Sequence, residues 1–94
     1  MSQENKTWTF LTNHSHVLLC LAKNPDLRIR DLALTVGITE RAVQRIIAEL
    51  TEDGFLEIEK NGRRNTYKII RNIPLKHPVE EHKTIDDLIK LIWD

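Results

Sequence analysis

One predicted helix carries polar side chains of the types that read base pairs. Its outward positions at helical spacing are Glu40, Arg41, Gln44 and Arg45. Arginine pairs bidentately with guanine edges in the major groove and glutamine does so with adenine, so Gln44 and Arg45 are the predicted base readers. Thr39 and Arg41 lie near the amino end of the helix, where hydroxyl groups, guanidinium groups and helix N-termini bind phosphate. This helix face therefore predicts contact with double-stranded DNA.

Further basic residues flank this helix in the sequence. Arg28 and Arg30 stand at the start of the preceding helix, where they would clamp phosphate groups. Arg63, Arg64 and Asn65 fall in a predicted hairpin turn, which exposes its tip to solvent. Such a basic turn fits a wing that reaches the DNA backbone or the minor groove beside the recognition helix.

Other reactive residue types give no comparable signal. Cys20 lies in the most apolar run of the chain, residues 17–22, where cysteine usually behaves as a small hydrophobic residue. The four histidines lack the close spacing of a metal site and are predicted to be surface residues: His14, His16, His77 and His82. The sequence also has no glycine-rich phosphate loop and no nucleophile elbow. We expect neither catalysis nor a cofactor nor a metal.

A helix-turn-helix must position the polar face. Two helices are predicted at Ile29–Val36 and Glu40–Asp53, separated by three residues. In that turn Gly37 suits a left-handed conformation and Thr39 supplies a capping hydroxyl. Ala33 sits where the second helix passes closest to the first. The apolar positions predicted to fill the wedge between the helices are Leu32, Val36, Ile38, Val43 and Ile46.

An earlier helix is predicted from Thr12 or Asn13 to Lys23. It is apolar on all sides over more than one turn, so both of its sides must be covered. The residues before it alternate aromatic side chains with threonine, which predicts a short extended piece pinned by Trp8 and Phe10.

A two-stranded hairpin is predicted after the helix-turn-helix. Residues 55–60 alternate apolar with charged side chains, and residues 66–70 are rich in strand formers. Between them, residues 61–65 begin with Asn-Gly, the strongest short hairpin signal. The predicted product is a wing with a basic turn.

These elements define the expected fold class, which is mainly α with a small β-hairpin. The architecture is a winged helix-turn-helix with a three-helix core, a two-stranded wing and a carboxy-terminal helix. We expect one domain over residues 1–94, because a chain this short buries one modest core. Within it, 1–7 should be frayed, 8–71 form the winged-helix core, 72–83 a linker and 84–94 the last helix.

The last helix carries an apolar stripe that needs a partner. Thr84 and Asp87 predict a variant of the capping box at its start. Together with the far side of the first helix, the stripe predicts a homodimer. The expected interface residues are Leu18, Leu19, Ile85, Leu88, Ile89, Ile92 and Trp93.

Charge is distributed unevenly along a chain whose net charge is zero. Residues 28–71 carry nine basic and seven acidic side chains, which leaves +2. Residues 72–94 carry three basic and five acidic side chains, which leaves −2. The middle of the chain is thus the part suited to phosphate.

The longest apolar run is too short for a membrane span, and no secretory signal is visible, so we expect a cytoplasmic protein without a membrane partner.

The sequence also resembles a known family. The stretch Arg28–Leu50, followed by Gly54-Phe-Leu and by residues 62–67, is similar to bacterial and archaeal winged-helix regulators of the broad MarR/ArsR-like type. The likeness runs from about Trp8 to Ile92. It implies a cytoplasmic DNA-binding transcription factor, usually homodimeric, with the second helix of the motif in the major groove.

Two departures from that family pattern are visible. The chain is shorter than typical MarR proteins, and the metal-sensing cysteine pair of ArsR proteins is absent because Cys20 is the single cysteine. The resemblance therefore leaves open whether a small-molecule effector is sensed. A winged helix can also serve as a protein-interaction module, and the neutral net charge fits that alternative.

Overall fold

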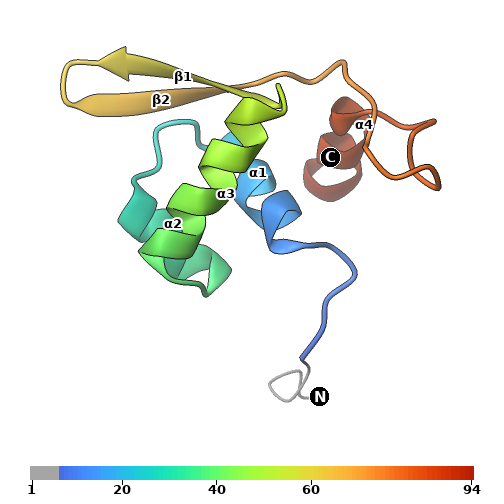
Figure 1. The fold of residues 1–94 in the computed structure, drawn as a ribbon, viewed down its shortest axis with the longest axis horizontal. Coiled ribbons are helices and arrows are strands. Elements are labelled where there is room, and N and C mark those ends of the chain that lie inside the picture. The colour runs from blue at the N-terminus through green and yellow to red at the C-terminus, as the bar shows by residue number, and fades with distance from the viewer. Residues whose placement is uncertain (1–6) are drawn as a thin grey trace.

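Four helices and one antiparallel hairpin make up the computed structural model, which describes residues 7–94 (Figure 1). In chain order they are α1 (Asn13–Lys23), α2 (Ile29–Val36), α3 (Glu40–Glu52), β1 (Leu56–Asn61), β2 (Arg64–Ile69) and α4 (Ile85–Trp93). This order confirms the predicted winged helix-turn-helix. Of the predicted frayed end, only Thr7 lies within the described residues, and it is exposed.

The turn between α2 and α3 has the predicted local structure. Gly37 adopts a φ of 87°, in the left-handed region that favours glycine, and its N–H donates to the carbonyl of Ala33 at 2.8 Å. Thr39 caps α3, because its hydroxyl accepts from the Ala42 N–H at 3.0 Å. Ala33 is buried, as a small residue at the closest approach of two helices should be.

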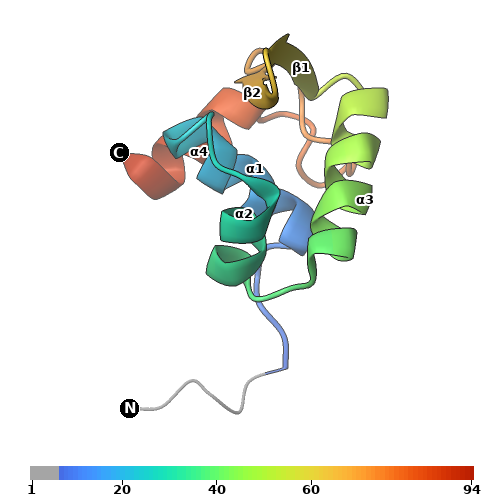
Figure 2. The same cartoon turned by 90° about the vertical axis from the view of Figure 1, so that its left-hand side faces the viewer.

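The core surrounds α1, which packs against α2, α3, β2 and α4 (Figure 2). Four of its side chains are buried: Val17, Leu18, Leu19 and Leu21. Cys20 lies at the edge of the core, where burial raises the pKa of its thiol. The apolar run of α1 is thus covered by neighbouring elements on more than one side, as predicted.

Residues 72–83, the predicted linker, form a loop with backbone hydrogen bonds across its base. Its two ends pair with each other, since the Leu75 N–H donates to the Lys83 carbonyl at 2.9 Å. The Ile85 N–H donates to the Ile73 carbonyl at 3.0 Å. The loop therefore returns the chain and directs α4 back toward α1.

Contacts between the end of α4 and α1 fix that return. The indole Nε1 of Trp93 donates to the backbone carbonyl of Leu19 at 2.9 Å. The ammonium group of Lys23 lies 4.2 Å from the centre of the Trp93 ring, within cation–π range. The two helices are therefore joined by apolar, hydrogen-bond and cation–π contacts.

This packing corrects the predicted dimer interface. Leu18, Leu19, Ile85 and Ile89 are each 5% exposed or less in the single chain. The two apolar surfaces cover each other, so these four side chains leave water without a second copy and the prediction was wrong for them. Leu88 is half-buried, and Ile92 and Trp93 remain 43% and 42% exposed.

The extended piece before α1 also differs from the prediction. Trp8 and Phe10 are 62% and 92% exposed, so they do not pin the chain to the core. Their rings contact each other edge to face, with centroids 5.0 Å apart.

The capping box of α4 gives a stability prediction. The Thr84 hydroxyl accepts from the Asp87 N–H at 3.2 Å, and the Asp87 carboxylate accepts from the Thr84 N–H at 2.9 Å. This backbone hydrogen bond from Thr84 is the main reason that the pKa of Asp87 is lowered. We expect Thr84→Ala to lower the free energy of unfolding by about 0.5–2 kcal/mol, measured by urea denaturation. Thr84→Ser should retain the cap, and an unchanged midpoint for Thr84→Ala would contradict the expectation.

The pH dependence of this contribution follows from the lowered pKa. Because the folded-state pKa of Asp87 lies below its ordinary value, its contribution to stability is present above that ordinary value. The contribution is lost as the pH falls through the folded-state pKa.

Candidate nucleic-acid interface

The recognition helix α3 exposes one face because the other is in the core. The buried side chains are Val43, Ile46, Ile47 and Leu50. The predicted outward residues Glu40, Arg41, Gln44 and Arg45 are all exposed. The core packing of α3 therefore leaves the predicted base readers on an open surface at its amino-terminal half.

One basic residue of α2, Arg30, lies near the amino end of α3. Arg30 lines a shallow hollow together with Thr39 and Glu40. This places Arg30 beside the amino end of α3, which carries the positive end of the helix dipole. The predicted phosphate contacts Arg30 and Thr39 thus lie together, next to the predicted base readers.

The remaining residues that are predicted to contact DNA line a second hollow. We call it the wing-root hollow; its volume is about 290 Å³, and it lies between the α1–α2 loop, the start of α2 and the hairpin. Among its lining residues are Arg28, Arg63, Arg64 and Asn65, with Asp26 as the only acidic one. Three arginines and one aspartate leave a charge of +2 on a chain whose net charge is zero. An anion is the ligand that this charge favours.

The wing is held in place by contacts with the α1–α2 loop. Nη2 of Arg64 donates to the backbone carbonyl of Asp26 at 3.1 Å, and the Thr66 hydroxyl donates to its carboxylate at 3.0 Å. The Tyr67 N–H on the outer edge of β2 donates to the Pro25 carbonyl at 3.1 Å. The hairpin is therefore fixed relative to α2, which keeps the arginines of both elements around one hollow.

The tip of the wing is shorter than the predicted turn over residues 61–65. Asn61 pairs with Arg64 and Lys60 with Asn65, so only Gly62 and Arg63 form the loop. Gly62 has a φ of 68°, as a two-residue hairpin loop requires at its first position. Arg63 is thus at the tip, whereas Arg64 and Asn65 belong to strand β2 and stand at its start.

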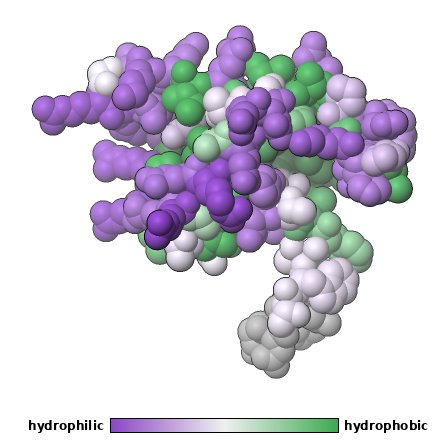
Figure 3. Space-filling view, viewed as in Figure 1, coloured by the Kyte–Doolittle hydropathy of each residue, from purple (hydrophilic) through white to green (hydrophobic). Residues whose placement is uncertain are grey.

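The arginines of this surface carry uncompensated charge. Within residues 7–94, only Arg45 and Arg71 lie within 4.0 Å of a carboxylate, that of Glu49 and that of Asp86. No carboxylate of the described residues lies that close to the other five arginines, which are Arg28, Arg30, Arg41, Arg63 and Arg64. Figure 3 shows hydrophilic side chains over the face on which the wing, α2 and α3 lie. The surface is therefore suited to a polyanion.

Sequence reasoning missed that Glu49 contacts Arg45, one of the predicted base readers. Glu49 lies 3.9 Å from the Arg45 guanidinium group, and its other carboxylate oxygen lies 2.7 Å from Nε2 of His14. The Arg45–Glu49 spacing of four residues is a signal that the sequence carries. The His14–Glu49 contact spans 35 residues and carries no such signal.

Two further observations concern metals and membranes. Among residues 7–94, no three histidine, cysteine or acidic side chains are grouped so that they could hold a metal ion. None of the helices in the described part of the chain is long and apolar enough to cross a membrane.

An exposed helix at the end of a helix-turn-helix, beside a basic hairpin, defines the winged-helix class of nucleic-acid-binding domains. The sequence agrees with this class, since residues 11–57, half of the chain, match the family model described as winged helix-turn-helix DNA-binding. The chain belongs to the winged helix-turn-helix DNA-binding family. No curated protein sequence gives a significant match to it.

Solved structures share the fold. One is ZitR of Lactococcus lactis in complex with DNA, with a TM-score of 0.56 and 15% identity. Another is the zinc-dependent MarR family transcriptional regulator AdcR in its zinc-bound state, with a TM-score of 0.53 and 22% identity. In each case 73% of this chain is covered, and the match spans 49% of the other chain. At the level of the fold, these matches agree with the resemblance to MarR-type regulators.

Proposed function

We propose that this chain binds double-stranded DNA as the DNA-reading domain of a transcriptional regulator. The observation that carries the proposal is the set of five arginines without a carboxylate partner on the face formed by α2, the amino end of α3 and the wing. Family membership and the fold shared with a DNA-bound regulator support it.

The residues divide into two roles. Gln44 and Arg45 project from α3 and read base edges in the major groove. Arg28, Arg63 and Arg64 surround the wing-root hollow, where they hold a backbone phosphate and set the orientation of α3. Specificity then depends on the first group and salt-sensitive affinity on the second.

Arg45 reaches base edges only if it leaves Glu49. Their separation of 3.9 Å and the 62% exposure of the Arg45 side chain describe a weak surface ion pair. Such a pair contributes little to stability, so a guanine edge competes with it readily.

A homodimer is a further part of the proposal. Leu91, Ile92 and Trp93 stay 77%, 43% and 42% exposed along α4 and provide an apolar edge for a second copy. A two-fold dimer places its recognition helices about 34 Å apart and prefers an inverted repeat. Selection of bound sequences from a random pool separates the cases, because a monomer enriches a single half-site.

Gln44→Ala should relax the selected sequence at adenine positions. Loss of one bidentate contact lowers discrimination against the wrong base by about 1–3 kcal/mol, while affinity for random duplex changes little. Competition binding with single-base variants of the selected site measures this. Glu52→Ala, at the other end of α3, is the control and should keep the wild-type preference. Equal loss of affinity for all sequences in Gln44→Ala would contradict the assigned role.

The alternative is a protein-interaction module that uses the same face. It predicts no enrichment of any sequence and weak binding to DNA even at low salt.

A further inference from the structure

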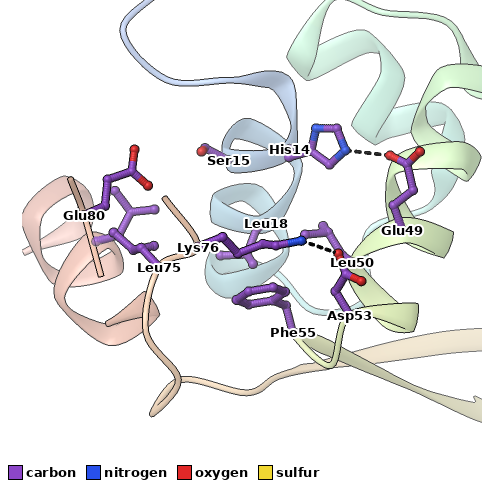
Figure 4. A pocket seen from close by; sticks show the side chains of 11 residues that line it. His14, Ser15, Leu18, Glu49, Leu50, Asp53, Phe55, Leu75, Lys76 and Glu80 are labelled. Atoms are coloured by element: carbon purple, nitrogen blue, oxygen red, sulfur yellow. Dashed lines mark hydrogen bonds and ion pairs between the residues drawn. The ribbon is translucent and has the colours of Figure 1, made fainter. Parts of the chain in front are cut away.

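A groove on the side of α3 away from the wing lies outside the proposed DNA-binding surface. It lies between α1, the carboxyl end of α3 and the loop before α4, and its volume is about 470 Å³ (Figure 4). Small-molecule sites typically have volumes of about 300–1,000 Å³. We call it the α1–α3 groove.

The floor of the α1–α3 groove is apolar and fixed by the core. Leu18 of α1, Leu50 of α3 and Phe55 line it, and they are 2%, 8% and 7% exposed. These side chains come from three parts of the chain that pack together, so the floor exists before any ligand binds. The Phe55 ring adds an aromatic surface, which attracts cations as well as apolar groups.

The rim of the groove is acidic. Its charged residues are Glu49, Asp53 and Glu80, with Lys76 as the single lysine. Three carboxylates and one ammonium group leave a charge of −2 among these four side chains. Within residues 7–94, Glu80 lies within 4.0 Å of no basic group.

A cationic side chain of the protein already occupies this rim. The Lys76 side chain extends across the groove in Figure 4 and places its ammonium group 2.7 Å from the Asp53 carboxylate. Lys76 is 67% exposed, and an exposed ion pair of this kind is weak. A ligand cation with an apolar body can therefore replace the ammonium group at Asp53 and gain the contact with Phe55.

We propose that the α1–α3 groove binds an organic cation with an aromatic or aliphatic body. The body lies on Leu18, Leu50 and Phe55, and the positive charge lies between Asp53 and Glu80. Binding of the cation itself does not depend on DNA. An effect of the cation on DNA affinity does rest on the proposed function, and it would arise because Glu49 of the rim also contacts Arg45. An occupied groove would then alter DNA affinity through that contact.

The first test uses two probes of nearly equal shape and opposite charge. Binding of tetraphenylphosphonium and tetraphenylborate is measured by calorimetry in sodium buffer without DNA, on the full chain with Arg28, Arg63 and Arg64 changed to glutamine, so that the wing-root hollow does not take up the anion. We expect tetraphenylphosphonium to bind at least tenfold more tightly than tetraphenylborate. Equal affinity of the two ions, or no binding of either at millimolar concentration, would overturn the proposal whether or not the chain binds DNA.

The second test uses variants with opposite expected effects. Glu80→Gln should weaken tetraphenylphosphonium binding roughly two- to fivefold, the scale of one exposed ion pair. Lys76→Gln should strengthen it by a similar factor, because it removes the competing cation. Glu81→Gln removes the same charge beside the groove without lining it and should leave the affinity unchanged. Equal effects of Glu80→Gln and Glu81→Gln, or weaker binding by Lys76→Gln, would place the cation elsewhere.

Discussion

Replacement of Arg28, Arg63 and Arg64 together by glutamine is expected to weaken binding to all duplex sequences alike. Each arginine that neutralises a phosphate releases about 0.9 counterion, so the slope of log affinity against log salt should fall by about 2.7 in magnitude. At about 0.1 M salt this change of slope corresponds to a roughly 500-fold loss of DNA affinity. The sequence preference set by Gln44 should remain.

A matched control separates the wing-root hollow from net charge. Lys76, Lys83 and Lys90 changed together to glutamine remove the same three charges from the loop before α4 and from α4 itself. Two of them already pair with aspartates, so their loss should change DNA affinity only a few-fold. Titrations of one labelled duplex across a salt series measure both variants. Equal losses would mean that total charge, rather than the hollow, governs affinity.

The second large effect concerns the core beneath this surface. Leu21 of α1 is fully buried, so Leu21→Ala removes apolar contacts and leaves a cavity. Such changes cost about 2–5 kcal/mol, a large part of the roughly 5–15 kcal/mol that stabilises a small domain. We expect a clear shift of the urea midpoint and a matching fall in melting temperature.

The same substitution at an exposed site provides the comparison. Leu34 is 75% exposed on α2, and Leu34→Ala should change stability by no more than about 0.5 kcal/mol. If Leu21→Ala unfolds at the wild-type midpoint, α1 does not form the centre of the core.

Local features of the fold followed from the sequence. The left-handed turn at Gly37, the cap at Thr39 and the capping box at Thr84 each depend on residues within four positions of one another. Their geometry is set by backbone sterics and nearby hydrogen bonds, which a short stretch of sequence determines. For the same reason the exposed face of α3 could be predicted from helical period alone.

Contacts between distant residues could not be predicted in this way. The apolar stripe on α4 showed that a partner was needed, but not that α1 of the same chain supplies it. The Trp93 indole donates to Leu19 across 74 residues of sequence, and Arg64 donates to Asp26 across 38. The loop over residues 72–83 decides whether α4 returns, and its hydrogen bonds between backbone groups have no residue signature.

The salt dependence of binding to random-sequence duplex DNA tests the central proposal most directly. Five arginines without a carboxylate partner predict a slope of log affinity against log salt near −4.5, at about 0.9 per phosphate contact. A slope of that size, with measurable binding at about 50 mM salt, is the expected result. No binding at that salt concentration, or affinity that does not change with salt, would contradict DNA binding and favour a protein partner for this face.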